Sequence, residues 1–160
     1  ILIMKETNPL KRILLVIPFL FFSFTLCAQD TNDYEKAKKE IETEFGTFPA
    51  MFASYPKAAL AGAWGSFKQL NGPNSTIPPK YRELLQLAVA SQIPCNYCIY
   101  FHTASAKAFG ATDEEIKEAV AQGAQTRHWS MILQGNQIDL EKFKTEFDGM
   151  MTHMANKSKQ

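Results

Sequence analysis

YRELLQLAVASQIPCNYCIYFHTASAKAFGATDEEIKEAV, residues 81–120, is the stretch that decides the fold class of this 160-residue chain. Apolar residues recur in it every three or four positions, which is the spacing of one face of an α-helix. Pro94 separates a helix predicted over Lys80–Ser91 from one predicted over Cys95–Phe109, and Gly110 ends the second. The stretch therefore predicts helices that follow one another with short connections.

The same pattern extends outward in both directions. Thr112 and Glu115 form a capping box that opens a helix predicted to about Ala124. No window alternates with the period of two that a strand requires. We therefore predict an all-α helical bundle in which residues 29–160 form a single domain. The further helices predicted are 33–45 (with Asp33 as N-cap), Pro49–Tyr55, Pro56–Leu70, Thr126–Gln134 and Asp139–His153, followed by a frayed tail over Ala155–Gln160.

The N-terminal residues resemble a secretory signal. Lys11 and Arg12 precede Ile13–Leu26, a 14-residue apolar run that is shorter than a membrane-spanning helix requires. We predict a signal peptide over residues 1–28 and export, to the periplasm of a bacterium. An uncleaved membrane anchor and a lipid attached to Cys27 are the alternatives.

The charge of the remaining chain is close to neutral. Residues 1–28 contain three basic side chains and one acidic side chain, so residues 29–160 carry 14 basic and 15 acidic residues. No run of lysine or arginine forms the electrostatic footprint that nucleic acid requires. We expect no nucleic-acid partner.

Two cysteines remain after the signal, and their spacing suggests chemistry. On a helix, Cys95, Cys98 and His102 fall within an arc of roughly 60°. Cys98 and His102 are one turn apart, so the imidazole can take the thiol proton, whereas Cys95 lies about 10 Å from His102 along the helix axis. Cys95 stands at the helix start, where backbone N–H groups favour a thiolate. The pair can also close into a disulfide.

Other interpretations of these residues stay open. Two cysteines three positions apart can be small buried hydrophobes, or they can supply two of the four ligands of a zinc site. His102 lies too far along the helix from Cys95 to suit such a site. A fourth ligand would have to come from Glu83, His128 or His153. If His128 is not a ligand, we predict that it lies on a helix surface or packs against neighbouring side chains. Trp64, Trp129 and the phenylalanines are assigned to the core.

Glu83, eleven residues, Cys95-x-x-Cys98 and then three residues before His102 form a pattern of four positions at fixed spacing. This pattern and its surroundings over residues 81–120 resemble the alkylhydroperoxidase D-like branch of the carboxymuconolactone decarboxylase family. The resemblance implies an all-helical fold that assembles into homo-trimers or homo-hexamers. This chain differs from the best-studied alkylhydroperoxidases at Tyr97, where those proteins have a second histidine between the two cysteines.

The resemblance also implies a thiol-dependent peroxidase or thiol–disulfide oxidoreductase without a cofactor. Glu83, through His102, would help to deprotonate Cys98, which would attack a hydroperoxide or disulfide substrate. Cys95 would then resolve the product, and an unidentified thiol reductant would restore the pair. Two alternatives remain: lactone decarboxylation, as in the family branch that lacks the cysteine pair, and a non-enzymatic helical module for assembly or metal binding.

Overall fold

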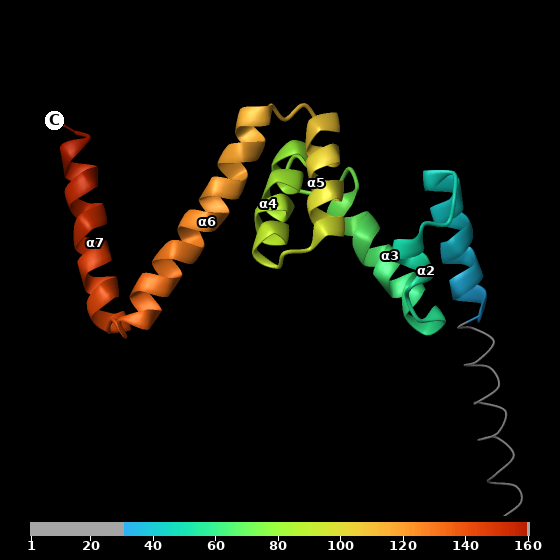
Figure 1. Cartoon of the computed structure of the whole chain (residues 1–160), viewed down its shortest axis with the longest axis horizontal. Coiled ribbons are helices and arrows are strands. Elements are labelled where there is room, and N and C mark those ends of the chain that lie inside the picture. Colours follow the sequence, from blue (N-terminus) through green and yellow to red (C-terminus); the bar gives the residue numbers. More distant parts are fainter. Residues whose placement is uncertain (1–30, 160) are drawn as a thin grey trace, which may run out of the picture. The chain divides into compact units, whose positions relative to one another are not determined.

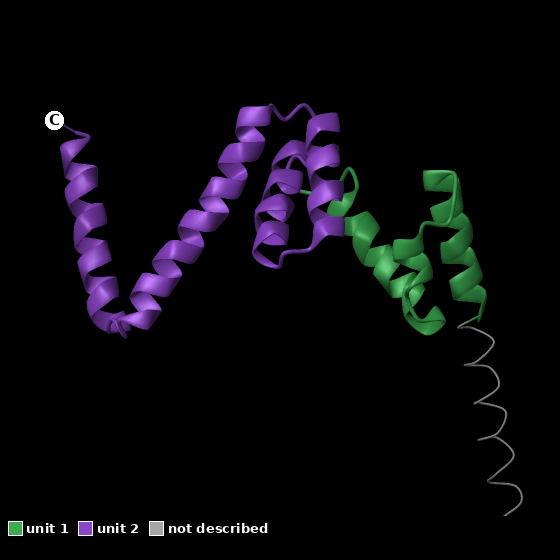
Figure 2. Cartoon of the chain, viewed as in Figure 1, with its two compact units in different colours: residues 1–75 green, residues 76–160 purple. Residues whose placement is uncertain are grey.

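The computed structural model describes residues 31–159, and the predicted signal peptide lies outside them (Figure 1). The described residues form helices joined by short turns and contain no strand, which confirms the all-α class. They divide into two compact units, one up to residue 75 and one from residue 76 on, which are described separately below (Figure 2). The single domain predicted for residues 29–160 stays a prediction.

The first unit is a small helical cluster with an aromatic core. A helix over residues 31–45 is followed by α2 (Ala50–Ala53) and α3 (Lys57–Asn71). Gly46 ends the first helix with a φ of +70°, a left-handed conformation that glycine adopts without strain. The rings of Phe52 and Trp64 pack edge to face with centroids 5.5 Å apart. The buried core consists of Ala37, Ile41, Phe52, Leu60 and Trp64.

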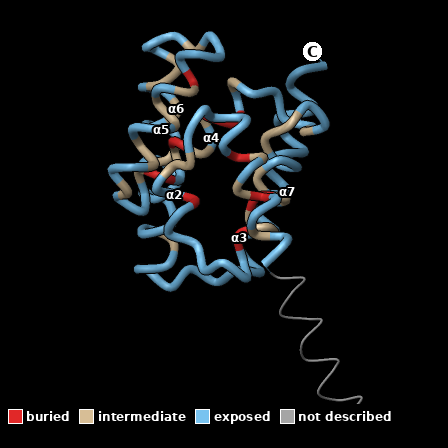
Figure 3. The backbone as a smooth tube through the Cα atoms, turned by 90° about the vertical axis from the view of Figure 1, so that its right-hand side faces the viewer, coloured by how far each residue is buried: buried red, intermediate tan, exposed pale blue. Residues whose placement is uncertain are grey.

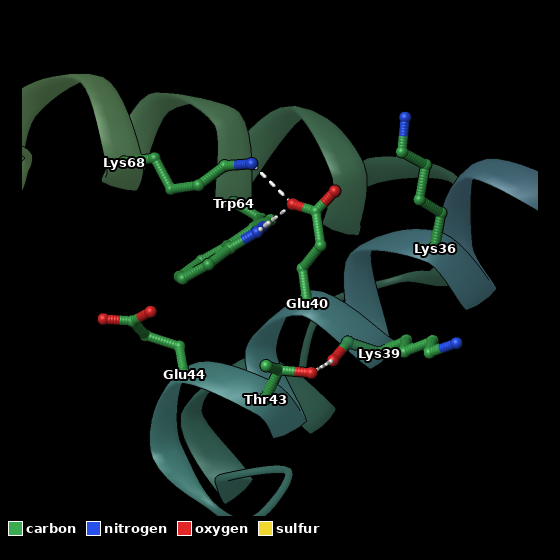
Figure 4. Close-up of a pocket in the computed structure, with 7 residues that line it drawn as sticks. All are labelled: Lys36, Lys39, Glu40, Thr43, Glu44, Trp64 and Lys68. Atoms are coloured by element: carbon green, nitrogen blue, oxygen red, sulfur yellow. Dashed lines mark hydrogen bonds and ion pairs between the residues drawn. The ribbon is translucent and has the colours of Figure 1, made fainter.

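A polar contact joins the first helix to α3 above this core. Glu40 Oε2 accepts hydrogen bonds from the Trp64 indole at 2.9 Å and from the Lys68 ammonium (Figure 4). These bonds lie beside a surface hollow of about 390 Å³ whose wall also carries Lys36, Lys39 and Glu44. The Lys68 hydrogen bond, followed by that from Trp64, holds the pKa of Glu40 below its ordinary value.

The lowered pKa of Glu40 makes the first unit sensitive to acid. A carboxylate whose pKa is lower in the folded than in the unfolded chain stabilises the fold above its unfolded pKa, which is about 4.5. This stabilisation is lost as the pH falls through the folded pKa. We expect Glu40→Gln to flatten the acid limb of unfolding, followed by Trp64 fluorescence in a Trp129→Phe background. An unchanged acid limb would contradict the prediction.

The second unit contains α4 (Pro79–Gln92), α5 (Asn96–Ala108), α6 (Asp113–Gly135) and α7 (Leu140–Lys157). The helix α4 packs against both α5 and the first half of α6. Gly123 permits a close approach of α4 and α6, because a Cβ atom there would lie 3.2 Å from the Ala88 carbonyl oxygen. The buried side chains of this unit are few: Arg82, Glu83, Leu87, Ala90 and Ala106. Figure 3 shows how far exposed residues outnumber buried ones along the described backbone.

Several predicted details were wrong. The two helices predicted on either side of residue 125 are one continuous helix, α6, because no proline or left-handed glycine interrupts them. The predicted frayed tail is helical to Lys157, so α7 is longer than expected. Asp33 lies inside the first helix and is not its N-cap. Trp129, assigned to the core, is 53% exposed, because the second half of α6 extends beyond α4.

Candidate active site

The cysteine pair stands where α5 begins. Cys95 is the N-cap residue in an extended conformation, so the helix starts one residue later than predicted. Its sulfur accepts a hydrogen bond from the Cys98 backbone N–H at 3.3 Å. An N-cap side chain normally satisfies one of the free N–H groups of the first turn, and here the Cys95 sulfur does so. The local sequence thus places one sulfur over the helix terminus and the other inside the first turn.

The two cysteines are joined as a disulfide, with Cα atoms 5.3 Å apart. Both residues are partly buried, so neither sulfur is sealed within a core. The structure therefore represents the oxidised form of the pair. A C-x-x-C pair at a helix start can cycle between dithiol and disulfide by thiol–disulfide exchange.

His102 is held by a buried carboxylate on the neighbouring helix. Its Nδ1 lies 2.8 Å from Glu83 Oε2, and both side chains are largely shielded from solvent. Because an ionised carboxylate only accepts hydrogen bonds, Nδ1 carries the proton in this contact. The Nε2 atom is then left as a proton acceptor. The α4–α5 packing thus fixes the tautomer that a general base requires.

Glu83 is 4% exposed, which the sequence did not predict. Near the N-terminus of a helix a glutamate is usually solvated, but α5 covers this one. Arg82 is 8% exposed, and its Nε lies 3.9 Å from Glu83 Oε1. The guanidinium therefore supplies positive charge beside the carboxylate, nearest to the oxygen that does not contact His102. Sequence reasoning missed Arg82; its only signal was its place next to Glu83.

An apolar hollow adjoins the cysteine pair. It has a volume of about 290 Å³, and both Cys98 and His102 contribute to its wall. Cys95 is not among the lining residues. The thiol-bearing residue and the imidazole therefore open on one shared space, which is the arrangement a nucleophile and its base require. The rest of the lining comes from α4 and the residue after it: Leu85, Gln86, Val89, Ala90 and Ile93.

The structure brings together the four predicted site residues but not the other candidates. Tyr97 is 90% exposed, and the Glu83–His102 contact forms without it. His128 and His153 are exposed on α6 and α7. Within residues 31–159, no three histidine, cysteine, aspartate or glutamate side chains converge as a metal site would require. Over the same residues, no helix has the length and apolar character needed to span a membrane.

Comparison with known proteins identifies the family. The sequence profile of the carboxymuconolactone decarboxylase family matches residues 54–137, more than half of the chain. The chain belongs to this family. The match spans α3 to α6 and includes the whole pattern from Glu83 to His102, so the resemblance predicted from that pattern is confirmed.

Two individual proteins are also similar to this chain. It is 33% identical over 91 residues to an uncharacterized protein of Cupriavidus necator; the alignment covers 57% of the chain and 76% of that protein. The crystal structure of an alkylhydroperoxidase AhpD core from Rhodospirillum rubrum has a TM-score of 0.60 to it, with 23% identity. That comparison covers 72% of this chain and 89% of the other. At this identity it establishes the shared fold.

Proposed function

We propose that this family member is a thiol-dependent peroxidase that also exchanges disulfides, acting through Cys98 and Cys95. The observation that carries the proposal is that Cys98, already bonded to Cys95, shares an apolar hollow with His102, whose ring is fixed by the buried Glu83. The fold shared with an alkylhydroperoxidase core supports it. Export to a bacterial periplasm and the predicted homo-trimer or homo-hexamer belong to the same proposal.

The reaction starts from the reduced pair. His102 Nε2 accepts the proton of the Cys98 thiol, and the thiolate attacks the terminal oxygen of a hydroperoxide. The O–O bond breaks, an alcohol leaves with the proton, and Cys98 becomes a sulfenic acid. The Cys95 thiol then attacks the Cys98 sulfur, which releases water and forms the disulfide seen here. An external dithiol reduces this disulfide through a mixed disulfide and closes the cycle.

The experiment is an assay of hydroperoxide-dependent dithiol oxidation by the purified chain. Dithiothreitol serves as reductant, and consumption of an organic hydroperoxide is followed. The matched control is Cys95→Ser/Cys98→Ser, which retains the helices and the hollow but has no redox pair. Turnover by the unmodified chain and none by the control is the expected result. Equal rates for both proteins would refute the proposal.

The apolar hollow predicts a preference among peroxides. Leu85, Val89 and Ile93 offer apolar contact to the organic group of a hydroperoxide, and hydrogen peroxide has no such group. We expect Val89→Glu to lower kcat/KM for cumene hydroperoxide roughly tenfold, since apolar contacts of this size contribute about 1–3 kcal/mol. The value for hydrogen peroxide should stay within about twofold. A parallel fall for both peroxides would show that the hollow does not bind the organic group.

A further inference from the structure

The end of α7 brings together three side chains that carry soft metal-binding atoms. Met150, His153 and Met154 are exposed, Met150 by 57% and Met154 by 49%. Positions i, i+3 and i+4 fall within an arc of about 100° on one face of a helix. His153 and Met154 are thus both neighbours of Met150, with Cβ atoms about 5–6 Å from its own.

Helix geometry allows these three side chains to meet at one point. Helical side chains lean toward the N-terminus, so those of His153 and Met154 extend over the turn that holds Met150. Methionine is unbranched and flexible, which lets its sulfur adjust to a nearby ligand. Two metal ligands on one helix face, one turn apart, are a known arrangement for histidine pairs. Two thioethers and one imidazole can therefore converge on a single ion.

The kind of apolar residue along α7 changes at this point. The large apolar residues before it are Leu140, Phe143 and Phe147, none of which carries a metal-binding atom. Within four residues of His153, every large apolar residue is a methionine. Leucine and methionine replace each other readily where only packing matters. Packing alone therefore gives no reason for sulfur to appear where the histidine does.

The donor atoms determine the class of ion that suits this group. Thioether sulfur is a soft ligand that favours Cu(I), and imidazole nitrogen also binds copper. Calcium and magnesium prefer oxygen ligands, whereas zinc sites use thiolate, imidazole or carboxylate. Residues 31–159 contain no cluster of histidine, cysteine, aspartate and glutamate that could hold such an ion, but a methionine site does not need one.

The charges around the three residues favour a monovalent ion. Glu146 is the carboxylate one turn before Met150, and its Oε1 lies 3.8 Å from the Lys142 ammonium. Lys157, one turn after His153, adds a positive charge on the same side of the helix. A divalent cation would be repelled more strongly here than a monovalent one. This agrees with the preference of the sulfur ligands for Cu(I).

His128 is the other histidine outside the active site, and it offers a smaller set of ligands. Met131 follows it by three residues in α6 and is 64% exposed. The sequence has no second methionine within one turn of His128. With one thioether and one imidazole, this pair should bind the same ion more weakly. It provides an internal comparison for the group on α7.

We propose that Met150, His153 and Met154 form a Cu(I)-binding site at the end of α7. The ligands are the two thioether sulfurs and one imidazole nitrogen. Because exposed side chains of one helix enclose the ion on one side only, it exchanges with solution. The site shares no residue with the cysteine pair or the apolar hollow. It therefore stands or fails separately from the proposed thiol chemistry.

NMR spectroscopy of the methionine methyl groups tests the proposal. The sample is the full chain with Cys27→Ser and an intact Cys95–Cys98 disulfide, so that no thiol competes for the ion. Its methionine methyl groups carry carbon-13, and Cu(I) is added as its acetonitrile complex without oxygen. The signals of Met150 and Met154 should shift together and saturate at one equivalent. The signal of Met131 should move only at higher concentration, and that of the exposed Met51 on α2 should stay in place.

Substitutions that keep the apolar character separate metal binding from packing. Met150→Leu/Met154→Leu keeps the size of both side chains but removes both sulfurs, so saturable binding at this site should disappear. His153→Ala should raise the Kd at least roughly tenfold, because loss of even an outer-sphere partner typically costs 10–100-fold in metal affinity. Competition with the chromogenic chelator ferrozine measures the Kd. The matched control, Met51→Leu, should leave it unchanged.

Three outcomes would overturn the proposal. One is an unchanged Kd in Met150→Leu/Met154→Leu. Another is an equal shift of the Met51 and Met150 signals, which would show that Cu(I) binds any exposed thioether. The third is a shift of the same size with Zn(II), which would show that sulfur does not select the ion. Circular dichroism verifies that α7 remains helical in each variant.

Discussion

Cys95→Ser is expected to stop after the first oxidation and to accumulate a sulfenic acid on Cys98, whereas Cys98→Ser is expected to form no such acid on Cys95. The reason is the shared hollow: Cys98 and His102 both line it, so substrate, nucleophile and base meet there. Cys95 does not line it. In Cys95→Ser no second thiol is left to resolve the acid, so the intermediate persists.

Mass spectrometry with a dimedone-type probe measures both variants after exposure to one equivalent of hydroperoxide. The competing physical argument is that the start of a helix stabilises a thiolate. Cys95 is the N-cap of α5, and its sulfur already accepts the Cys98 N–H hydrogen bond. An adduct on Cys95 in Cys98→Ser, with none on Cys98 in Cys95→Ser, would show that the helix terminus outweighs the base. The two roles would then be exchanged.

His102→Ala is expected to slow the oxidation of Cys98 by roughly 10²–10⁴-fold, the usual contribution of a positioned general base. His102 lies in α5 one turn after Cys98, and alanine is a good helix former, so α5 should remain intact. Stopped-flow measurement of thiol loss under a fixed excess of hydroperoxide gives the rate. His128→Ala is the matched control, because it removes an exposed histidine from another helix.

Added imidazole separates a chemical from a structural cause. If His102→Ala has lost only a base, free imidazole should restore part of the rate in the hollow. The control variant should not respond to it. A rate within about threefold of the unmodified chain, well below the range expected of a general base, would show that His102 does not take the Cys98 proton.

Glu83→Gln should lower the same rate without removing the base. The amide is nearly the same size as the carboxylate, but it no longer requires the proton to sit on His102 Nδ1. In a fraction of the molecules the proton then sits on His102 Nε2, and this tautomer cannot accept the thiol proton at that atom. Replacing a buried hydrogen bond to a charged group with one to a neutral amide should also reduce the free energy of unfolding by about 1 kcal/mol. Imidazole rescue should be weak here, since the ring of His102 still fills its place.

The local sequence determined the helices and the chemical character of the site. Helix formation depends on apolar spacing, glycine and proline breaks and caps, all of which are short-range features. Thr112 and Glu115 form the predicted capping box, and Gly110 follows α5 with a φ of +83°. The spacing of Cys95, Cys98 and His102 follows from one helix, so it could be worked out without a structure. The role of Glu83 as the partner of His102 came only from the resemblance to the family.

Burial and contact between helices were decided by the tertiary structure, because they depend on residues far apart in the chain. Its position near the start of α4 would by itself leave Glu83 solvated. The packing of α4 on α5 buries Glu83 and makes it the partner of His102, with Arg82 beside its other oxygen. The same packing creates the apolar hollow, which no sequence pattern indicated. Trp129 is the opposite case, a side chain that is more exposed than predicted. Its large apolar ring favours a core position, but α6 extends past the helices that could cover it.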